Sequence, residues 1–265
     1  MGRWPRLTRS EGSKAPPRLS TLTPPSRITA PPPHQNGEGS ESRSRTLYGR
    51  RRGKKLRAGQ EALLDTLLPK LLVSVPPEPQ KLDLAALFGA REVWLEVGFG
   101  AGEHLVWQAE QHPDVGLIGC EPYMNGVAKC LAHIERTGVG NVRLFTDDAR
   151  LVMAALPDQS LSRAFVLFPD PWPKTRHHKR RFVARANLDV LARLLKPGAE
   201  LRLATDDPSY LPWMVEHACT HRAFEWLAER PADWRTRPAD WPPTRYERKK
   251  IAGTPTFLRL RRRSD

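Results

Sequence analysis

An acid, an indole ring and a cationic run stand together directly after the apolar run 164–168. Asp170 lies between two prolines, and Trp172 follows the second of them. Proline fixes its own φ and disfavours helical backbone in the residue before it, so the Asp170 carboxylate is expected on stiff, extended backbone. Trp172 offers a flat face to a base, and basic residues after it suit phosphate. The segment predicts a pocket for a base within a polynucleotide; the alternative is an ordinary turn with a solvated basic face.

A glycine-rich turn, 98–102, follows a predicted strand and opens a predicted helix at Glu103. An open α/β sheet binds nucleotide-like ligands at such a turn, because glycines let the backbone approach closely. Glu121 ends the next predicted strand about 20 residues further on, where an acid can accept hydrogen bonds from a ribose. A dinucleotide site would have a third glycine in place of Glu103, and a carboxylate there repels a pyrophosphate. We therefore expect an adenosine ligand without phosphates.

S-adenosylmethionine meets that description. Its ribose is expected at Glu121, its amino-acid end by Glu96 and the glycines Gly98 and Gly100, and its adenine near the acid pair 147–148. Each feature alone has a simpler interpretation, since an acid can cap a helix and a glycine turn is common. The order of the features along the chain is what favours this ligand.

Strands and helices alternate through the middle of the chain. Apolar patterns predict strands at 93–97, 115–121, 142–146, 165–168 and 200–205, with helices at 103–111, about 125–137, and from about 182 to the Lys196-Pro197-Gly198 stop. Short buried strands with helical crossovers specify a parallel sheet that is covered on both faces. No helix is expected between 224–227 and 257–260, so these two should pair antiparallel at the sheet edge.

Composition divides the chain into three parts. Residues 1–45 are basic and rich in proline and serine, which predicts a disordered tail. Residues 46–75 are expected to form a basic lead-in and a helix that packs on the main domain, residues 76–265. The apolar face of that helix is Leu63, Leu64, Leu67, Leu68, Leu71 and Leu72.

Net charge and cysteine content indicate the kind of partner and the cellular compartment to expect. The net charge of +14 over 265 residues favours a polyanionic partner. Three scattered cysteines, Cys120, Cys130 and Cys219, suit a reducing, cytoplasmic setting and give neither a disulfide framework nor a metal-binding spacing. No apolar run approaches the roughly 20 residues that a membrane span needs, so we expect no membrane association and no metal.

Four stretches of the chain resemble the tRNA (guanine-N7-)-methyltransferases of the bacterial TrmB type. They are 95–102, 168–172 with its downstream basic residues, 204–206 and 244–247, and the resemblance extends from about Tyr48 to the C-terminus. It implies an α/β, Rossmann-like S-adenosylmethionine-dependent methyltransferase fold, with a mostly parallel seven-stranded sheet and an antiparallel edge strand. The tail before Arg45 has no counterpart in that pattern, and Arg245-Tyr246 replaces the more frequent Lys-Phe.

The resemblance also assigns roles. It implies cofactor contacts at Glu96, Glu121, Asp148 and Asp170, and methylation of guanine 46 in the variable loop of tRNA. The substrate contacts that it implies are Lys174, Asp206, Thr244, Arg245, Tyr246 and Glu247, with RNA contacts along Arg176, His177, His178, Lys179, Arg180 and Arg181.

Guanine N7 is a lone-pair acceptor and carries no proton, so this chemistry needs alignment and charge stabilisation rather than a base. Asp170 is the expected catalytic residue, through its hold on the guanine and its stabilisation of the purine cation. Two other classes stay open from the residues alone: a nicotinamide-dependent oxidoreductase, and a non-catalytic RNA-binding protein with a relic cofactor fold. Glu103 weighs against the first, and the intact Glu121 and Asp170 weigh against the second. The oligomeric state is open, with a monomer favoured.

Overall fold

The computed structural model describes residues 49–89, 91–242 and 253–264. These residues belong to one compact unit, 46–265. The expected division of the chain at residues 45 and 75 stays a prediction.

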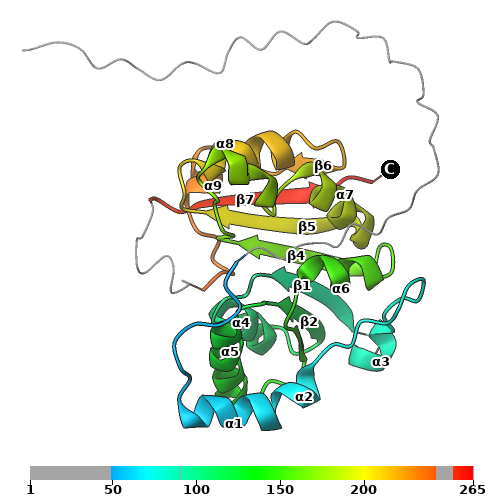
Figure 1. Ribbon diagram of the computed structural model, residues 1–265. Coiled ribbons are helices and arrows are strands. Elements are labelled where there is room, and N and C mark those ends of the chain that lie inside the picture. Colours follow the sequence, from blue (N-terminus) through cyan, green and yellow to red (C-terminus); the bar gives the residue numbers. More distant parts are fainter. Residues whose placement is uncertain (1–48, 90, 243–252, 265) are drawn as a thin grey trace, which may run out of the picture. The chain divides into compact units, whose positions relative to one another are not determined.

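One seven-stranded sheet organises this unit, in the order β3-β2-β1-β4-β5-β7-β6 (Figure 1). The first five strands are parallel to one another, while β7 runs antiparallel to both of its neighbours, β5 and the edge strand β6. This confirms the predicted mostly parallel sheet and the antiparallel pairing near its edge. The strands are β1 Glu92–Val97, β2 Val115–Cys120, β3 Val142–Phe145, β4 Leu161–Leu167, β5 Leu195–Thr205, β6 Phe224–Trp226 and β7 Thr256–Arg262.

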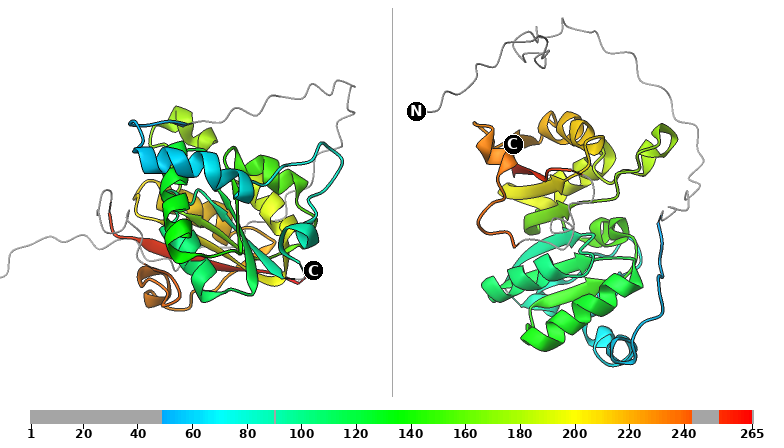
Figure 2. Two further views of the ribbon diagram at one scale, coloured as in Figure 1. Left: turned by 90° about the horizontal axis from the view of Figure 1, so that it is seen from below. Right: turned by 90° about the vertical axis from the view of Figure 1, so that its left-hand side faces the viewer.

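Helices cover both faces of the sheet (Figures 1 and 2). Side chains alternate across a strand, and β1 accordingly sends Val93, Leu95 and Val97 into one apolar cluster and Trp94 into the other. The first cluster includes residues of α3 (Leu84–Phe88), α6 (Ala149–Ala155), α7 (Arg185–Leu194) and α8 (Tyr210–Met214). The second includes residues of α1 (Ala58–Thr66), α2 (Leu68–Leu71), α4 (Glu103–Gln111) and α5 (Met124–Thr137).

Two predicted helices differ from the observed ones. The leucine-rich helix is broken between α1 and α2, because Pro69 has no N–H to continue the α1 hydrogen-bond pattern and is tolerated only in the first turn of a new helix. Leu72 lies beyond α2 and is exposed. The helix expected from about Phe182 begins at Arg185, after a 3-10 helix at Thr175–Arg180, and ends at Leu194. The Pro197-Gly198 stop lies inside β5, whose first residue, Leu195, pairs with Leu161.

Several short elements have no counterpart among the predicted ones. They are α3, α6, α8, a π-helical turn at Val215–Cys219 and α9 at Ala232–Arg235. Within the described ranges, no helix is long and apolar enough to cross a membrane, and no group of three or more potential metal-ligating side chains is present.

Candidate active site

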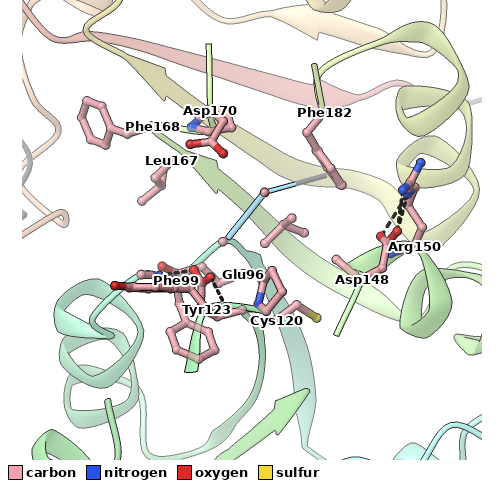
Figure 3. A pocket seen from close by; sticks show the side chains of 18 of the residues that line it. Glu96, Phe99, Cys120, Tyr123, Asp148, Arg150, Leu167, Phe168, Asp170 and Phe182 are labelled. Atoms are coloured by element: carbon pink, nitrogen blue, oxygen red, sulfur yellow. Dashed lines mark hydrogen bonds and ion pairs between the residues drawn. The ribbon is translucent and has the colours of Figure 1, made fainter. Parts of the chain in front are cut away.

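A cavity of about 590 Å³ lies at the carboxyl ends of the parallel strands. Sheet order reverses between β1 and β4, and ligands of open α/β sheets bind outside the strand ends at such a point. Figure 3 shows Asp170 and Phe168 across this cavity from Glu96 and Phe99, with Asp148 and Arg150 to one side. The predicted site residues that line it are Glu96, Gly98, Gly100, Glu121, Asp148, Asp170, Lys179, Arg180 and Arg181.

The glycine turn fits between the cavity and helix α5. Gly98, Gly100 and Gly102 have φ values of +76°, +59° and +83°, which side chains rarely adopt. A Cβ at Gly102 would lie 2.4 Å from the Cys130 sulfur of α5, whereas one at Gly98 would meet no atom within 4 Å. Gly102 therefore permits close packing of two helices, and Gly98 leaves open space beside the cavity.

Glu121 is fixed by backbone donors. Its two carboxylate oxygens accept the N–H groups of Gly100 at 2.8 Å and Tyr123 at 2.9 Å. Burial raises the pKa of Glu121; these two hydrogen bonds lower it, and the charges of Asp170 and Glu96 raise it further. The carboxylate is held in one orientation, with lone pairs left to accept hydroxyl groups.

Glu96 has a partner that sequence reasoning missed. His104 lies with Nδ1 2.7 Å from Oε2 of Glu96, and each side chain is only 3% exposed. Gln108, one turn further along α4, lies with Nε2 3.2 Å from His104 Nε2. The available signal was a pair of polar residues four apart on the apolar side of a predicted helix.

The acid pair after β3 is already engaged with arginines. Asp148 caps α6 by accepting the Arg150 N–H at 3.0 Å, and its carboxylate also accepts from the Arg150 side chain at 2.9 Å. Asp147 pairs with Arg51, which comes from the basic lead-in. Asp148 thus serves as a helix cap, the simpler of the two interpretations considered for it, while it also lines the cavity.

Asp170 lies between two residues with left-handed backbone, Phe168 at φ +50° and Trp172 at φ +44°. Non-glycine residues in this region are strained and cluster at functional sites. The Asp170 side chain has contact with solvent, yet the surrounding protein displaces part of its water, and this desolvation raises its pKa. Trp172 carries the Arg180 guanidinium over its ring at 4.9 Å and contacts His177 edge-on.

The cationic segment forms the 3-10 helix beside the cavity mouth. Arg176 and Lys179 are exposed there. Loss of hydration, and then the positive charges of the neighbouring arginines and lysines, lower the pKa of His177. Arg181 is buried: it donates to the Pro171 carbonyl and lies over the Tyr210 and Trp213 rings. Its guanidinium is therefore committed to protein contacts.

Among the described residues, three further predicted site residues do not line the cavity: Lys174, His178 and Asp206. Lys174 precedes the 3-10 helix and is exposed, His178 stands edge-on to Trp213, and Asp206 follows the end of β5. Residues 244–247 lie outside the described ranges.

Known proteins resemble this chain over most of its length. Residues 90–258 match the family described as "Putative methyltransferase". A tRNA (guanine-N(7)-)-methyltransferase of Paramagnetospirillum magneticum is 52% identical over 234 residues, which are 87% of this chain and 98% of that protein. Another, of Rhodospirillum rubrum, is 54% identical over 223 residues, 82% of this chain and 88% of that protein. The chain belongs to the tRNA (guanine-N7-)-methyltransferase family.

Membership of this family confirms the resemblance found in the sequence motifs, and it does not favour the oxidoreductase or the relic RNA-binding protein. Among solved structures, a 16S rRNA (adenine(1408)-N(1))-methyltransferase from Catenulisporales acidiphilia aligns with 70% of this chain and 93% of that one. Its TM-score is 0.47 and its identity 17%.

Proposed function

We propose that this protein transfers a methyl group from S-adenosylmethionine to N7 of a guanine in tRNA. The observation that carries the proposal is the distribution of charge in the cavity. Its lining includes the buried carboxylates of Glu96 and Glu121 and the carboxylate of Asp170, together with Lys179 and Arg180 from the cationic segment. An acidic interior suits a cationic cofactor, and a basic approach suits a polyanionic substrate.

The residues present fit S-adenosylmethionine. Glu121 has its carboxylate fixed by Gly100 and Tyr123 and can accept the ribose hydroxyls. The open space beside Gly98 leaves room for the amino-acid end next to Glu96. Asp148 lines the same cavity. Its carboxylate already accepts from Arg150 and can accept a further hydrogen bond from the adenine amino group. Glu103 also lines the cavity, and its charge disfavours a dinucleotide pyrophosphate.

Methyl transfer to N7 does not require the protein to remove a proton from the guanine. When bound, the cofactor supplies a methyl group on a sulfonium, which the N7 lone pair can take without losing a proton. Asp170, on its strained loop, accepts hydrogen bonds from the guanine N–H edge and stabilises the positive charge that appears on the purine. Because a buried base cannot reach this cavity, the target guanine leaves its stack.

The finer assignments follow the family resemblance. We assign the methylated position to guanine 46, and the substrate contacts to Lys174, Asp206 and residues 244–247. Arg176, His177, His178, Lys179 and Arg180 supply the phosphate contacts, with Arg181 as their buried support. A cytoplasmic setting and a monomer complete the proposal.

One experiment tests the function and the position together. Bulk tRNA is incubated with the pure protein and methyl-labelled S-adenosylmethionine, and the labelled nucleotide is mapped. We expect a single N7-methylguanosine in the variable loop. Label at another position contradicts guanine 46, and no label contradicts the activity. A rise in melting temperature with NAD but not with S-adenosylmethionine would favour the oxidoreductase.

A further inference from the structure

We infer that His104, held by Gln108 as a neutral imidazole with its proton on Nδ1, is a positioning residue that orients Glu96 toward the amino-acid end of the cofactor. This inference rests on the proposed cofactor, but its central feature, the protonation of His104, belongs to the ligand-free protein.

The imidazole ring of His104 is enclosed by neighbouring side chains. His104 begins the buried face of α4, is 3% exposed, and packs edge-on against Phe165 with ring centroids 4.7 Å apart. Trp241 stands edge-on at 6.2 Å on another side. With the ring enclosed, Nδ1 faces Glu96 at 2.7 Å and Nε2 faces Gln108 at 3.2 Å.

Gln108 decides which ring nitrogen carries the proton. Its Nε2 donates to the backbone carbonyl of Asp240 at 2.8 Å, so the amide nitrogen must point that way. The alternative orientation would set the Gln108 Oε1 acceptor against the Asp240 carbonyl, another acceptor. In the orientation observed, Oε1 is buried with no hydrogen-bond partner, which is unfavourable. The two hydrogen bonds that Nε2 makes offset this loss.

The tautomer of His104 determines what its ring offers to Glu96. Because Gln108 presents N–H to His104 Nε2, that nitrogen must accept, and the proton of the neutral ring lies on Nδ1. Nδ1–H then donates to Glu96 without adding a positive charge. Glu96 keeps its negative charge for the cofactor ammonium, and one of its oxygens is fixed in direction. A protonated His104 would both neutralise this charge and set a donor against the Gln108 amide.

Ligands that differ only at the amino-acid end test this role. S-adenosylhomocysteine carries that end, whereas 5′-methylthioadenosine has the same nucleoside and thioether without it. In His104→Leu we expect the dissociation constant for S-adenosylhomocysteine to rise about tenfold or more, the scale of a lost hydrogen bond to a charged group. The dissociation constant for 5′-methylthioadenosine should change by less than about twofold, a small fraction of one such bond.

Three further variants separate positioning from folding. His104→Asn keeps an N–H near the position of Nδ1 and should restore most of the S-adenosylhomocysteine affinity. Gln108→Met removes the amide but keeps the side-chain length, and should weaken the same ligand selectively. Gln111→Met, an exposed glutamine of the same helix, is the matched control and should bind like the wild type.

Nitrogen-15 spectra of the ligand-free wild type complete the test. We expect a protonated Nδ1 and an unprotonated Nε2 at His104 near neutral pH, and loss of this preference in Gln108→Met. A protonated Nε2 in the wild type, or equal weakening of both ligands in His104→Leu and Gln108→Met, would overturn the inference. A wild type that binds neither nucleoside ligand overturns the proposed cofactor instead, while the spectra still judge the state of His104.

Discussion

Glu121 and Asp170 hold protons at higher pH than ordinary carboxyl groups do. Desolvation is the largest cause of the raised pKa of Glu121 and the single cause of the raised pKa of Asp170. The negative charges of Asp170 and Glu96 raise the pKa of Glu121 further. A cation bound between these groups favours their charged forms. Cofactor binding should therefore release protons in the pH range between the usual carboxyl pKa and the raised values.

The sign of the pH dependence follows from this proton release. Affinity for S-adenosylmethionine should increase as pH rises through the raised pKa values of Glu121 and Asp170, and become constant above them. Titration calorimetry in two buffers with different heats of ionisation measures both the affinity and the protons released.

Two comparisons make this prediction specific. S-adenosylhomocysteine has no sulfonium charge and should show a weaker pH dependence. Glu121→Gln removes one titrating group and should reduce the proton release. Affinity that falls with rising pH would contradict the assigned direction of these pKa shifts.

Asp170→Asn keeps the shape of the side chain and loses its charge. We expect a single-turnover rate lower by roughly tenfold to a thousandfold, about 1.4 to 4 kcal/mol, as for one electrostatic contact in a transition state. Asp170→Ala should be slower still, because it also removes the hydrogen bonds that we propose Asp170 accepts from guanine. The measurement is methyl transfer with tRNA and cofactor both saturating.

The pH profile of that same reaction distinguishes charge stabilisation from proton removal. With both ligands bound, the cofactor's positive charge favours the Asp170 carboxylate, so the wild-type rate should be flat near neutrality. An obligatory deprotonation near neutrality in the wild type, absent from Asp170→Asn, would make Asp170 a general base and refute the mechanism.

At the scale of elements, the strands and the glycine turn could be predicted, because local sequence patterns determine them. The strands ending at Val97 and Cys120 are short apolar runs, and the glycines between them need left-handed backbone, so both could be recognised. The break at Pro69 was not predicted, because the prediction rested on the leucine spacing alone.

Contacts between distant parts of the chain could not be predicted in this way. Arg51 and Asp147 are 96 residues apart, and Gln108 and Asp240 are 132 apart. No periodicity links such partners, so only the folded arrangement reveals that the basic lead-in approaches the acid pair or that α4 is bonded to the segment after α9. The left-handed backbone at Phe168 and Trp172 is likewise imposed by tertiary structure.

The contact between α5 and the glycine turn gives an element-scale prediction. A Cβ at Gly126 would lie 2.3 Å from the Gly100 carbonyl oxygen, so Gly126→Ala must push the helix away from the turn. We expect a loss of about 1 to 3 kcal/mol in the free energy of unfolding. Because Gly100 also donates to Glu121, cofactor affinity should fall too. Urea unfolding and calorimetry measure the two effects.

Gly59→Ala is the matched control. Gly59 lies in α1, and a Cβ there meets no atom within 4 Å, so the added methyl should be neutral or stabilise the helix by up to about 1 kcal/mol. Gly126→Ala with unchanged stability and unchanged affinity would show that α5 and the glycine turn adjust independently of each other.

At the scale of the whole molecule, charge is distributed unevenly along the chain. The net charge is +14, and residues 1–45 contribute seven arginines and one lysine against three glutamates. This tail precedes every motif of the site and lacks the apolar residues that a core needs. It can add sequence-independent attraction to tRNA, a contribution that weakens as salt increases.

Deletion of residues 2–45 should therefore separate attraction from chemistry. We expect an unchanged turnover rate at saturating tRNA and unchanged cofactor affinity, because Glu96, Glu121 and Asp170 remain in place. The Michaelis constant for tRNA should rise moderately, and its dependence on salt should become shallower. Replacing the seven tail arginines with glutamine in the full-length chain should reproduce both changes if charge is the cause. A truncated protein that folds and binds cofactor but has lost turnover would instead place part of the catalytic machinery in the tail.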